Sequence, residues 1–169
     1  MLHTSRWSPS VTVAALIEHG GRYLLVEEET PEGLRLNNPA GHLDPEESPL
    51  QGVVREALEE TARAFTPIAV VGVYLSRFVR PARGQQPAED VSYLRIAFCG
   101  TVGEPLPGRA LDTGIERTLW LTPDEIRASR ARHRSPLVLR CIEDHLAGRR
   151  HPLDLIVTDP SVYTPEIKG

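Results

Sequence analysis

The chain has 169 residues, of which 40% are hydrophobic and 25% charged, as expected for a globular protein that folds as one domain. Its formal net charge of −4 argues against binding of nucleic-acid polymers and against a polybasic membrane-surface protein, because both need a strongly basic face. Two cysteines are too few for a disulfide scaffold or a cysteine-based zinc cluster, and their apolar surroundings predict buried free thiols.

The first quarter of the chain predicts a strand hairpin. Residues Val11–Glu18 and Arg22–Glu28 are rich in apolar and β-branched side chains, and the Gly20-Gly21 pair between them indicates a turn. A short extended piece follows at Leu34–Leu36. The segment Asn37–Glu47 contains many turn-forming residues, and we expect it to be a loop.

A helix is predicted from Pro49 to about Arg63, with Ser48 as its N-cap, because apolar residues recur there at steps of three and four. Further along the chain, the patterns predict strands at Ile68–Val79, Val91–Val102 and Glu116–Leu121. A second helix is predicted to begin at Thr122–Glu125 with Thr122 as its N-cap, and a third begins at Arg134–Pro136 and ends near Gly148. These elements define an α/β protein with a mixed sheet in a single domain of residues 1–169, with the core fold at about residues 10–150.

Two segments lie outside this core. Arg80–Asp90 is predicted to be a loop rich in Pro, Gly and Gln, and long loops often carry function. Residues 151–169 are predicted to form an extended tail that packs on the body. The N-terminal residues 1–10 have no apolar signal core, and no window reaches the ~18 apolar residues of a membrane span, so we expect a cytoplasmic protein without membrane contact.

The predicted helix at Pro49 carries a concentrated negative charge. Glu56, Glu59 and Glu60 are related as i, i+3 and i+4, so they share one helix face, and Glu47 just upstream can add a fourth carboxylate. Arg55 is the main counter-charge close by. Taken alone, three such glutamates are typical of a solvated acidic face.

The spacing around these glutamates is more informative. Gly41 is followed after five residues by Glu47, and after seven more by Arg55-Glu56-Ala57-Leu58-Glu59-Glu60. This pattern resembles the signature motif of the Nudix hydrolase family, whose fold is an α/β/α sandwich. Two closing positions differ, since Ala62 stands for a glycine and Arg63 for an apolar residue. Ala62 leaves the geometry of the helix end open, because glycine adopts positive φ more readily than alanine.

Three shorter segments, Pro39–Leu43, Arg134–Val138 and Gly148–Leu153, resemble the NudJ-type phosphatases within this family. The family resemblance implies that Mg²⁺ or Mn²⁺ is bound by Glu56, Glu59 and Glu60, with the Ala40 carbonyl as a further ligand. Carboxylates suit these hard cations, which prefer oxygen ligands. Glu47 and Arg55 are interpreted as groups that hold the ligand carboxylates in place.

The general base stays open at this point. It can be one of the glutamates of the motif or a carboxylate from another loop, since the family varies here. Glu116, four residues before Trp120, is one candidate, and a surface charge at a strand end is an equally good interpretation of it.

Candidate substrate-binding residues are Gly41, His42, Arg77 and Arg95. His42 can hydrogen-bond a phosphate or relay a proton, unless it is an ordinary exposed loop residue. One or two of the arginines on and beside the long strands can grip a terminal phosphate. The aromatic residues Trp7, Tyr74, Phe78 and Tyr93 can stack on a ring, although core packing is the better interpretation for most of them.

The resemblance implies metal-dependent hydrolysis of phosphoanhydride bonds by water attack in nucleoside tri- or diphosphates, and the subgroup resemblance adds pyrimidine or thiamine diphosphates. A more selective pyrophosphatase acting on a dinucleotide or nucleotide sugar is the alternative. A non-catalytic binding module is disfavoured, because every charged residue of the motif is present. The expected partner is therefore a small-molecule diphosphate or nucleotide, bound by a monomer or a homodimer.

Overall fold

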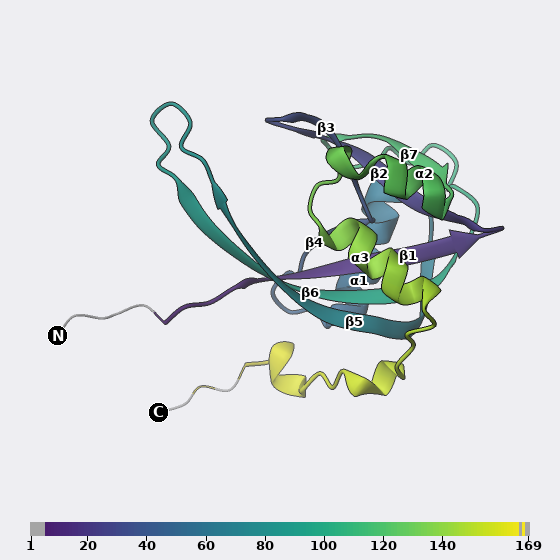
Figure 1. The fold of residues 1–169 in the computed structure, drawn as a ribbon. Coiled ribbons are helices and arrows are strands. Elements are labelled where there is room, and N and C mark those ends of the chain that lie inside the picture. Colours follow the sequence, from purple (N-terminus) through teal and green to yellow (C-terminus); the bar gives the residue numbers. More distant parts are fainter. Residues whose placement is uncertain (1–5, 166, 168–169) are drawn as a thin grey trace.

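The computed structural model describes residues 6–165 and 167 and contains seven strands and three α-helices within them (Figure 1). The strands are β1 (Ser10–His19), β2 (Arg22–Thr30), β3 (Gly33–Asn37), β4 (Ala40–His42), β5 (Phe65–Arg80), β6 (Glu89–Val102) and β7 (Ile115–Leu121). The α-helices are α1 (Pro49–Thr61), α2 (Pro123–Ala128) and α3 (Leu137–Leu146), and the short 3₁₀ turns are η1 (Arg130–Arg132), η2 (Leu153–Leu155) and η3 (Pro160–Val162).

The sheet is mixed and consists of two parts. In one part, β4, β1, β6 and β5 lie side by side, with β1 and β6 parallel and the other neighbours antiparallel. In the other part, β2 pairs antiparallel with β3 and β7. Only two residue pairs, Glu18 with Tyr23 and His19 with Arg22, join β1 to β2. The two parts therefore diverge with distance from this hairpin turn.

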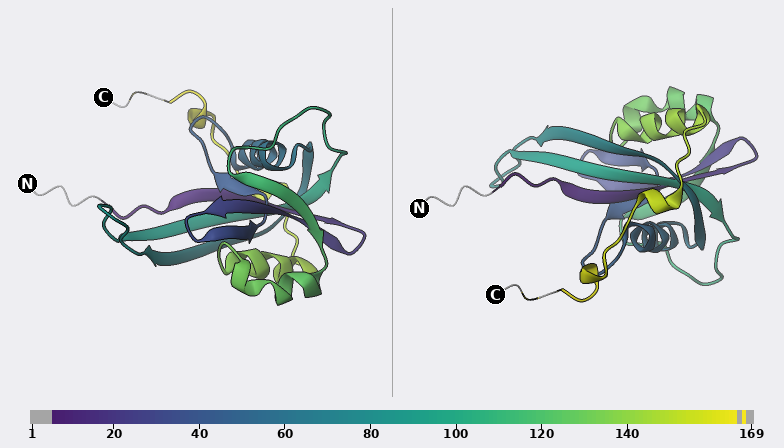
Figure 2. Two further views of the ribbon diagram at one scale, coloured as in Figure 1. Left: turned by 90° about the horizontal axis from the view of Figure 1, so that it is seen from above. Right: turned by 90° about the horizontal axis from the view of Figure 1, so that it is seen from below.

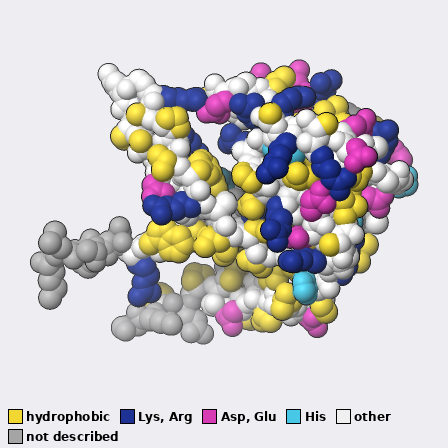
Figure 3. Space-filling model, in the orientation of Figure 1, with side chains coloured by type: hydrophobic (Ala, Val, Ile, Leu, Met, Phe, Trp, Pro, Cys, Tyr) yellow, Lys and Arg dark blue, Asp and Glu magenta, His cyan; other side chains and the backbone are white. Residues whose placement is uncertain are grey.

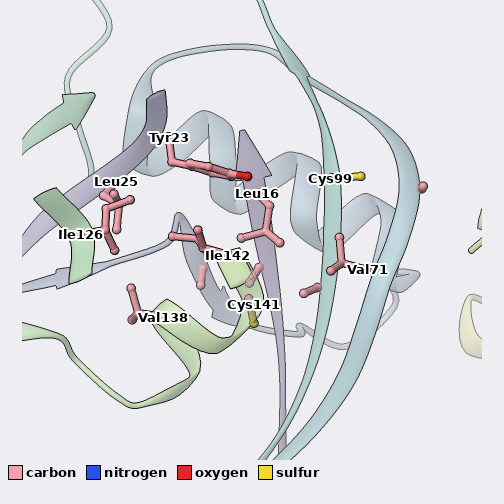
Figure 4. Close-up of a cluster of buried hydrophobic side chains, with 13 residues drawn as sticks. Leu16, Tyr23, Leu25, Val71, Cys99, Ile126, Val138, Cys141 and Ile142 are labelled. Atoms are coloured by element: carbon pink, nitrogen blue, oxygen red, sulfur yellow. The ribbon is translucent and has the colours of Figure 1, made fainter. Parts of the chain in front are cut away.

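Helices cover both faces of the sheet, with α1 on one side and α2 and α3 on the other (Figure 2). A buried cluster that includes Leu16, Tyr23 and Ile142 packs beneath α2 and α3 (Figure 4). A second cluster, which includes Val13 and Val53, packs beneath α1. Strand β1 contributes to both, which explains its uninterrupted apolar sequence. The predicted α/β/α sandwich is thus confirmed, and both cysteines are buried and free as expected.

Helix α1 begins and ends in well-defined caps. The Ser48 hydroxyl accepts from the Gln51 amide, and the Gln51 side chain accepts from the Ser48 amide, which completes a capping box. At the other end, Ala62 adopts the left-handed conformation with φ 55° and donates its N–H to the Leu58 carbonyl. The cap geometry is therefore kept without glycine, at a conformational cost of about 1 kcal/mol.

The structure corrects two predictions. The segment Asn37–Glu47, predicted to be a loop, contains strand β4. The predicted loop Arg80–Asp90 is wrong at both ends, because the β5–β6 pairing continues to Arg80 and Glu89, and Arg83 and Gln86 exchange two further hydrogen bonds. Ion pairs between the two strands, such as that of Arg80 with Glu89, favour this extension. The result is a projecting hairpin, residues 77–92, that extends beyond the last β1–β6 residue pair (Figure 1).

The C-terminal segment packs on the body but is not simply extended, because it contains the turns η2 and η3. His151 and Val70 of β5 exchange two backbone hydrogen bonds of 2.8 and 2.9 Å. Farther along, the Tyr163 hydroxyl donates to Gln51 of α1. None of the helices described is long and apolar enough to cross a membrane. Part of the N-terminal segment assessed above, residues 1–5, lies outside the described residues.

A half-buried histidine near the end of α3, His145, gives the fold a predictable pH dependence. His145 Nδ1 lies 2.5 Å from the Tyr23 hydroxyl, and its Nε2 lies 2.5 Å from an Arg150 guanidinium nitrogen. Because a guanidinium only donates, Nε2 accepts and the ring is neutral with its proton on Nδ1. Burial, and then the charge of Arg150, lower the pKa of His145 to about 4.

The unfolded chain, with a histidine pKa of about 6.5, binds this proton more readily than the folded protein. The free energy of unfolding is therefore expected to fall as the pH drops from about 6.5 toward 4. A His145→Gln variant should lose part of this pH dependence, measured as urea midpoints at pH 7 and pH 5. If the urea midpoint shifts equally between pH 7 and pH 5 in the wild type and in His145→Gln, His145 is excluded as a source of the pH dependence.

Candidate active site

One face of α1 gathers the acidic residues around a single arginine. Arg55 donates to both carboxylate oxygens of Glu47, at 2.7 and 3.0 Å. Its Nη1 nitrogen donates to Glu56 at 2.8 Å and to Glu59 at 3.1 Å, and Nη2, which also bonds Glu47, donates to the backbone carbonyl of His42 at 3.0 Å. One planar guanidinium thus fixes three carboxylates and strand β4 relative to each other.

Strand β4 presents its backbone to the same face. Ala15 donates to the Pro39 carbonyl and Leu43 donates to the Val11 carbonyl. Because hydrogen-bonded pairs alternate along antiparallel strands, the peptide groups of Ala40 point away from β1. The Ala40 N–H accordingly donates to Glu60 Oε2 at 2.9 Å. The Ala40 carbonyl has the direction that the predicted ligand role requires.

The backbone of Gly41 lies close to the Glu56 carboxylate. A Cβ atom placed on Gly41 would lie 2.1 Å from Glu56 Oε1, far inside any real contact. Only glycine therefore lets β4 pass this close to Glu56 without moving the carboxylate.

The environment of the carboxylates favours a bound cation. Burial, aided by the charges of Glu56, Glu28 and Asp112, raises the pKa of Glu60 to about 8, although the Ala40 N–H opposes the shift. Burial also raises the pKa of Glu56, in spite of Arg55. In contrast, the Arg55 hydrogen bonds lower the pKa of Glu47. Nearby positive charge would keep Glu56 and Glu60 ionised, and oxygen donors suit Mg²⁺ or Mn²⁺.

The donors therefore fit the predicted cation, although they are not arranged around one point. Among the residues described, no three His, Cys, Asp or Glu side chains form such a group. Glu56 and Glu59 turn toward Arg55, and Glu60 toward the Ala40 amide. Binding of a cation by all three glutamates would require these hydrogen bonds to be exchanged.

Two further acids lie near Glu60 that sequence reasoning missed. Glu28 comes from β2 and forms an ion pair with Arg134 at 3.2 Å, and burial raises its pKa. Asp112 comes from the segment between β6 and β7, and its amide donates to the Glu59 carbonyl at 2.8 Å. The charges of both raise the pKa of Glu60. Glu116, the predicted candidate, is exposed on β7 and is not among these charges.

The structure does not bring the predicted substrate-binding residues His42, Arg77 and Arg95 together. Alternation along β4 directs the His42 side chain to the sheet face opposite Glu56, where its ring lies 5.8 Å from that of Tyr93. Arg95 is buried, and its guanidinium donates to Asn38 Oδ1 at 3.2 Å and Asn37 Oδ1 at 3.4 Å. Arg77 lies on the projecting hairpin, where it is 70% exposed and paired with Asp90.

One surface cavity lies apart from the glutamates. It has a volume of about 590 Å³ and opens between η1 and α3, with Arg130, His133, Arg134, Leu139 and Arg140 among its lining residues. Its lining includes none of the motif residues, and its link to the acidic face is Arg134, which pairs with Glu28. We therefore locate the site from the carboxylate geometry and not from cavity size.

The carboxylate face, the glycine approach and the sandwich fold together define a Nudix-type hydrolase. The chain matches the NUDIX domain over residues 7–141, and it belongs to the Nudix hydrolase family. It is 31% identical over 150 residues to phosphatase NudJ of Escherichia coli strain K12, covering 89% of this chain and 92% of that protein.

Solved structures agree with this assignment. A NUDIX hydrolase from Nitrosomonas europaea is 48% identical, with a TM-score of 0.79, and the match covers 90% of this chain and 98% of that one. A MutT NUDIX hydrolase from Burkholderia pseudomallei is 22% identical, with a TM-score of 0.62, over 82% of this chain and 98% of that one, and shows the shared fold alone. The family and the likeness to NudJ, both predicted from the sequence, are thus confirmed.

Substitution of Gly41 by alanine tests the contact between β4 and α1. The added methyl group must displace the Glu56 carboxylate or β4, so kcat is expected to fall by about 10- to 100-fold. Gly103→Ala is the matched control, because a Cβ there meets no atom within 4 Å. Phosphate-release kinetics compare the two variants, and equal kcat values would show that the close approach of Gly41 is irrelevant to turnover.

Proposed function

We propose that this protein catalyses metal-dependent hydrolysis of phosphoanhydride bonds in nucleoside tri- and diphosphates by attack of water. The arrangement of Arg55 with Glu47, Glu56 and Glu59, beside a buried Glu60 bonded to β4, is the observation that supports this proposal. An acidic face that served only solubility would not need buried carboxylates or a glycine in contact with them.

The proposed roles follow from burial and hydrogen bonding. Glu56, Glu59 and Glu60, with the Ala40 carbonyl, would hold Mg²⁺ or Mn²⁺, which supplies charge neutralisation on the phosphates and makes water more acidic. Arg55 and Glu47 position these carboxylates. Arg95 is better placed than Arg77 to contact the substrate, since Arg95 is buried beside the Asn38–Ala40 segment and Arg77 is paired with Asp90.

For the general base, Glu28 and Asp112 are stronger candidates than Glu116, because their charges act on Glu60. Pyrimidine or thiamine diphosphates are further proposed substrates, and the name of the relative NudJ, a phosphatase, is consistent with hydrolysis of a phosphate compound. A dinucleotide or nucleotide sugar remains the alternative substrate class. Cytoplasmic location and a monomeric or homodimeric state stay predictions.

A substrate panel tests this proposal. Nucleoside tri- and diphosphates, thiamine diphosphate, a dinucleotide polyphosphate and a nucleotide sugar are each incubated with Mg²⁺ or Mn²⁺. Phosphate is then measured with and without added inorganic pyrophosphatase. The proposal predicts metal-dependent release from nucleoside tri- or diphosphates, and the coupling separates phosphate from pyrophosphate as product. Release from dinucleotides or nucleotide sugars alone would favour the alternative, and no release from any compound would contradict the proposal.

A further inference from the structure

A row of aromatic side chains lies on the sheet face that α3 only partly covers. Along β6, Tyr93 and Arg95 share the face of Ala97 and Cys99, which belong to the cluster beneath α3. Along β4, His42 shares the face of Ala40, and along β5, Phe78 shares the face of Tyr74, which packs against the same cluster. The register therefore brings side chains from three strands to one surface.

Tyr93 is near both of the other rings. The ring centroids of His42 and Tyr93 are 5.8 Å apart, and those of Phe78 and Tyr93 are also 5.8 Å apart with only 32° between the planes. They are not core residues, because Phe78 is 42% exposed, His42 is exposed and Tyr93 is half-buried. The row leads from β4 onto the projecting hairpin, along which apolar side chains gather on the face shown in Figure 3.

A buried cation lies at the inner end of this row. Arg95 is only 7% exposed, and its guanidinium donates to two neutral amide oxygens, those of Asn37 and Asn38. Among the ion pairs of the described residues, none includes Arg95. A guanidinium with five N–H groups and no ion pair is suited to donate hydrogen bonds to an anionic ligand oxygen.

The row is continuous with the acidic face. Asn38, which accepts from Arg95, is two residues from Ala40, which donates to Glu60, and His42 follows Gly41, which contacts Glu56. The acids thus lie on one side of the Asn38–His42 segment, and Arg95 and the rings lie on the other. Because β4 pairs only with β1, it is at the edge of its part of the sheet, and no further strand separates the two sides there.

We infer that His42, Tyr93 and Phe78 form a stacking surface for a planar ring of the substrate, and that Arg95 binds an anionic oxygen between that ring and the hydrolysed bond. This inference rests on the proposed function and narrows it to substrates that carry a nucleobase or a similar aromatic ring. It also gives His42 a contact with the ring, in place of the phosphate contact or proton relay expected from the sequence.

The test uses ligand pairs that differ only in the ring and requires no hydrolysis. Affinities for AMP, CMP and ribose 5-phosphate are measured by calorimetry with the wild type, Tyr93→Leu, Phe78→Leu and Tyr163→Leu. Tyr163 is the matched control, because it is a partly exposed aromatic residue on the C-terminal segment. Stacking of one base on aromatic side chains predicts that the wild type prefers at least one nucleotide over ribose 5-phosphate by about 5- to 100-fold.

Tyr93→Leu and Phe78→Leu should each reduce this preference by about fivefold or more, whereas Tyr163→Leu should keep it. Ribose 5-phosphate affinity should be unchanged in all variants, because a general structural defect would lower both. The inference is overturned if the wild type binds all three ligands equally or not at all, or if both ring variants keep the full preference. Failure of the proposed function would appear separately, as absence of metal-dependent phosphate release in the substrate panel.

Discussion

Replacing Glu60 with glutamine is expected to lower kcat by on the order of 100-fold or more, about 3 kcal/mol of transition-state stabilisation. Glu60 is the most deeply buried acid of the proposed cation site, and its carboxylate is held by the Ala40 amide. Glutamine keeps the shape and an acceptor oxygen for that amide but cannot carry negative charge. Glu59→Gln is expected to lower kcat by a similar factor.

The folded state should survive the Glu60 change. Burial already raises the pKa of Glu60 to about 8, so a neutral amide replaces a group whose ionised form is disfavoured near neutral pH. Thermal unfolding should therefore show equal or slightly higher stability, while phosphate-release kinetics at saturating metal show the loss. Glu104→Gln, at an exposed position, is the control. Near-normal turnover in both Glu59→Gln and Glu60→Gln would contradict the proposed ligand roles.

Arg55→Lys is expected to lower kcat by about 10- to 100-fold although the charge is kept. A lysine ammonium cannot satisfy Glu47, Glu56 and Glu59 in the planar geometry of the guanidinium. The variant should also unfold more easily, by about 2 kcal/mol, because the Glu47 carboxylate is largely buried and loses its bidentate partner. Urea unfolding and steady-state kinetics give the two readouts, with Arg130→Lys as an exposed control.

A double-mutant cycle separates the Arg55–Glu47 pair from other effects. With Glu47→Gln as the second change, the coupling energy for stability is expected to be about 1–3 kcal/mol. The pair lowers the pKa of Glu47, so its contribution is present above the unfolded pKa of Glu47 and is lost as the pH falls through the lower folded value. Additive effects of the two substitutions at pH 7 would show that Arg55 does not position Glu47.

The acidic helix could be predicted from the sequence because its information is local. The spacing of Glu56, Glu59 and Glu60 fixes their common face, and Ser48 and Pro49 fix the start of the helix. The structure keeps the left-handed cap at Ala62, where the sequence differs from the family, because one alanine in that conformation costs little.

The rest of the candidate site depends on contacts between distant segments. Glu28 and Asp112 reach Glu60 from β2 and from the segment before β7, and no spacing in the sequence signals this. Strand β4 was missed because three residues are too short for a periodic pattern. The two strands of the projecting hairpin were predicted, but their ends at Arg80 and Glu89 were assigned to the loop, because Pro and Gly at the turn indicated a longer loop. The aromatic row was predicted to be mainly core packing, because strand alternation does not reveal where α3 ends.

The requirement for a divalent cation tests the central claim most directly. The enzyme is stripped with a chelator, the chelator is removed, and phosphate release from a nucleoside triphosphate is measured before and after addition of Mg²⁺ or Mn²⁺. The carboxylate site, which is rich in oxygen donors and contains no thiolate, predicts no hydrolysis without the metal and recovery with either ion. Full activity after exhaustive chelation would contradict the assignment of Glu56, Glu59 and Glu60 as a catalytic cation site.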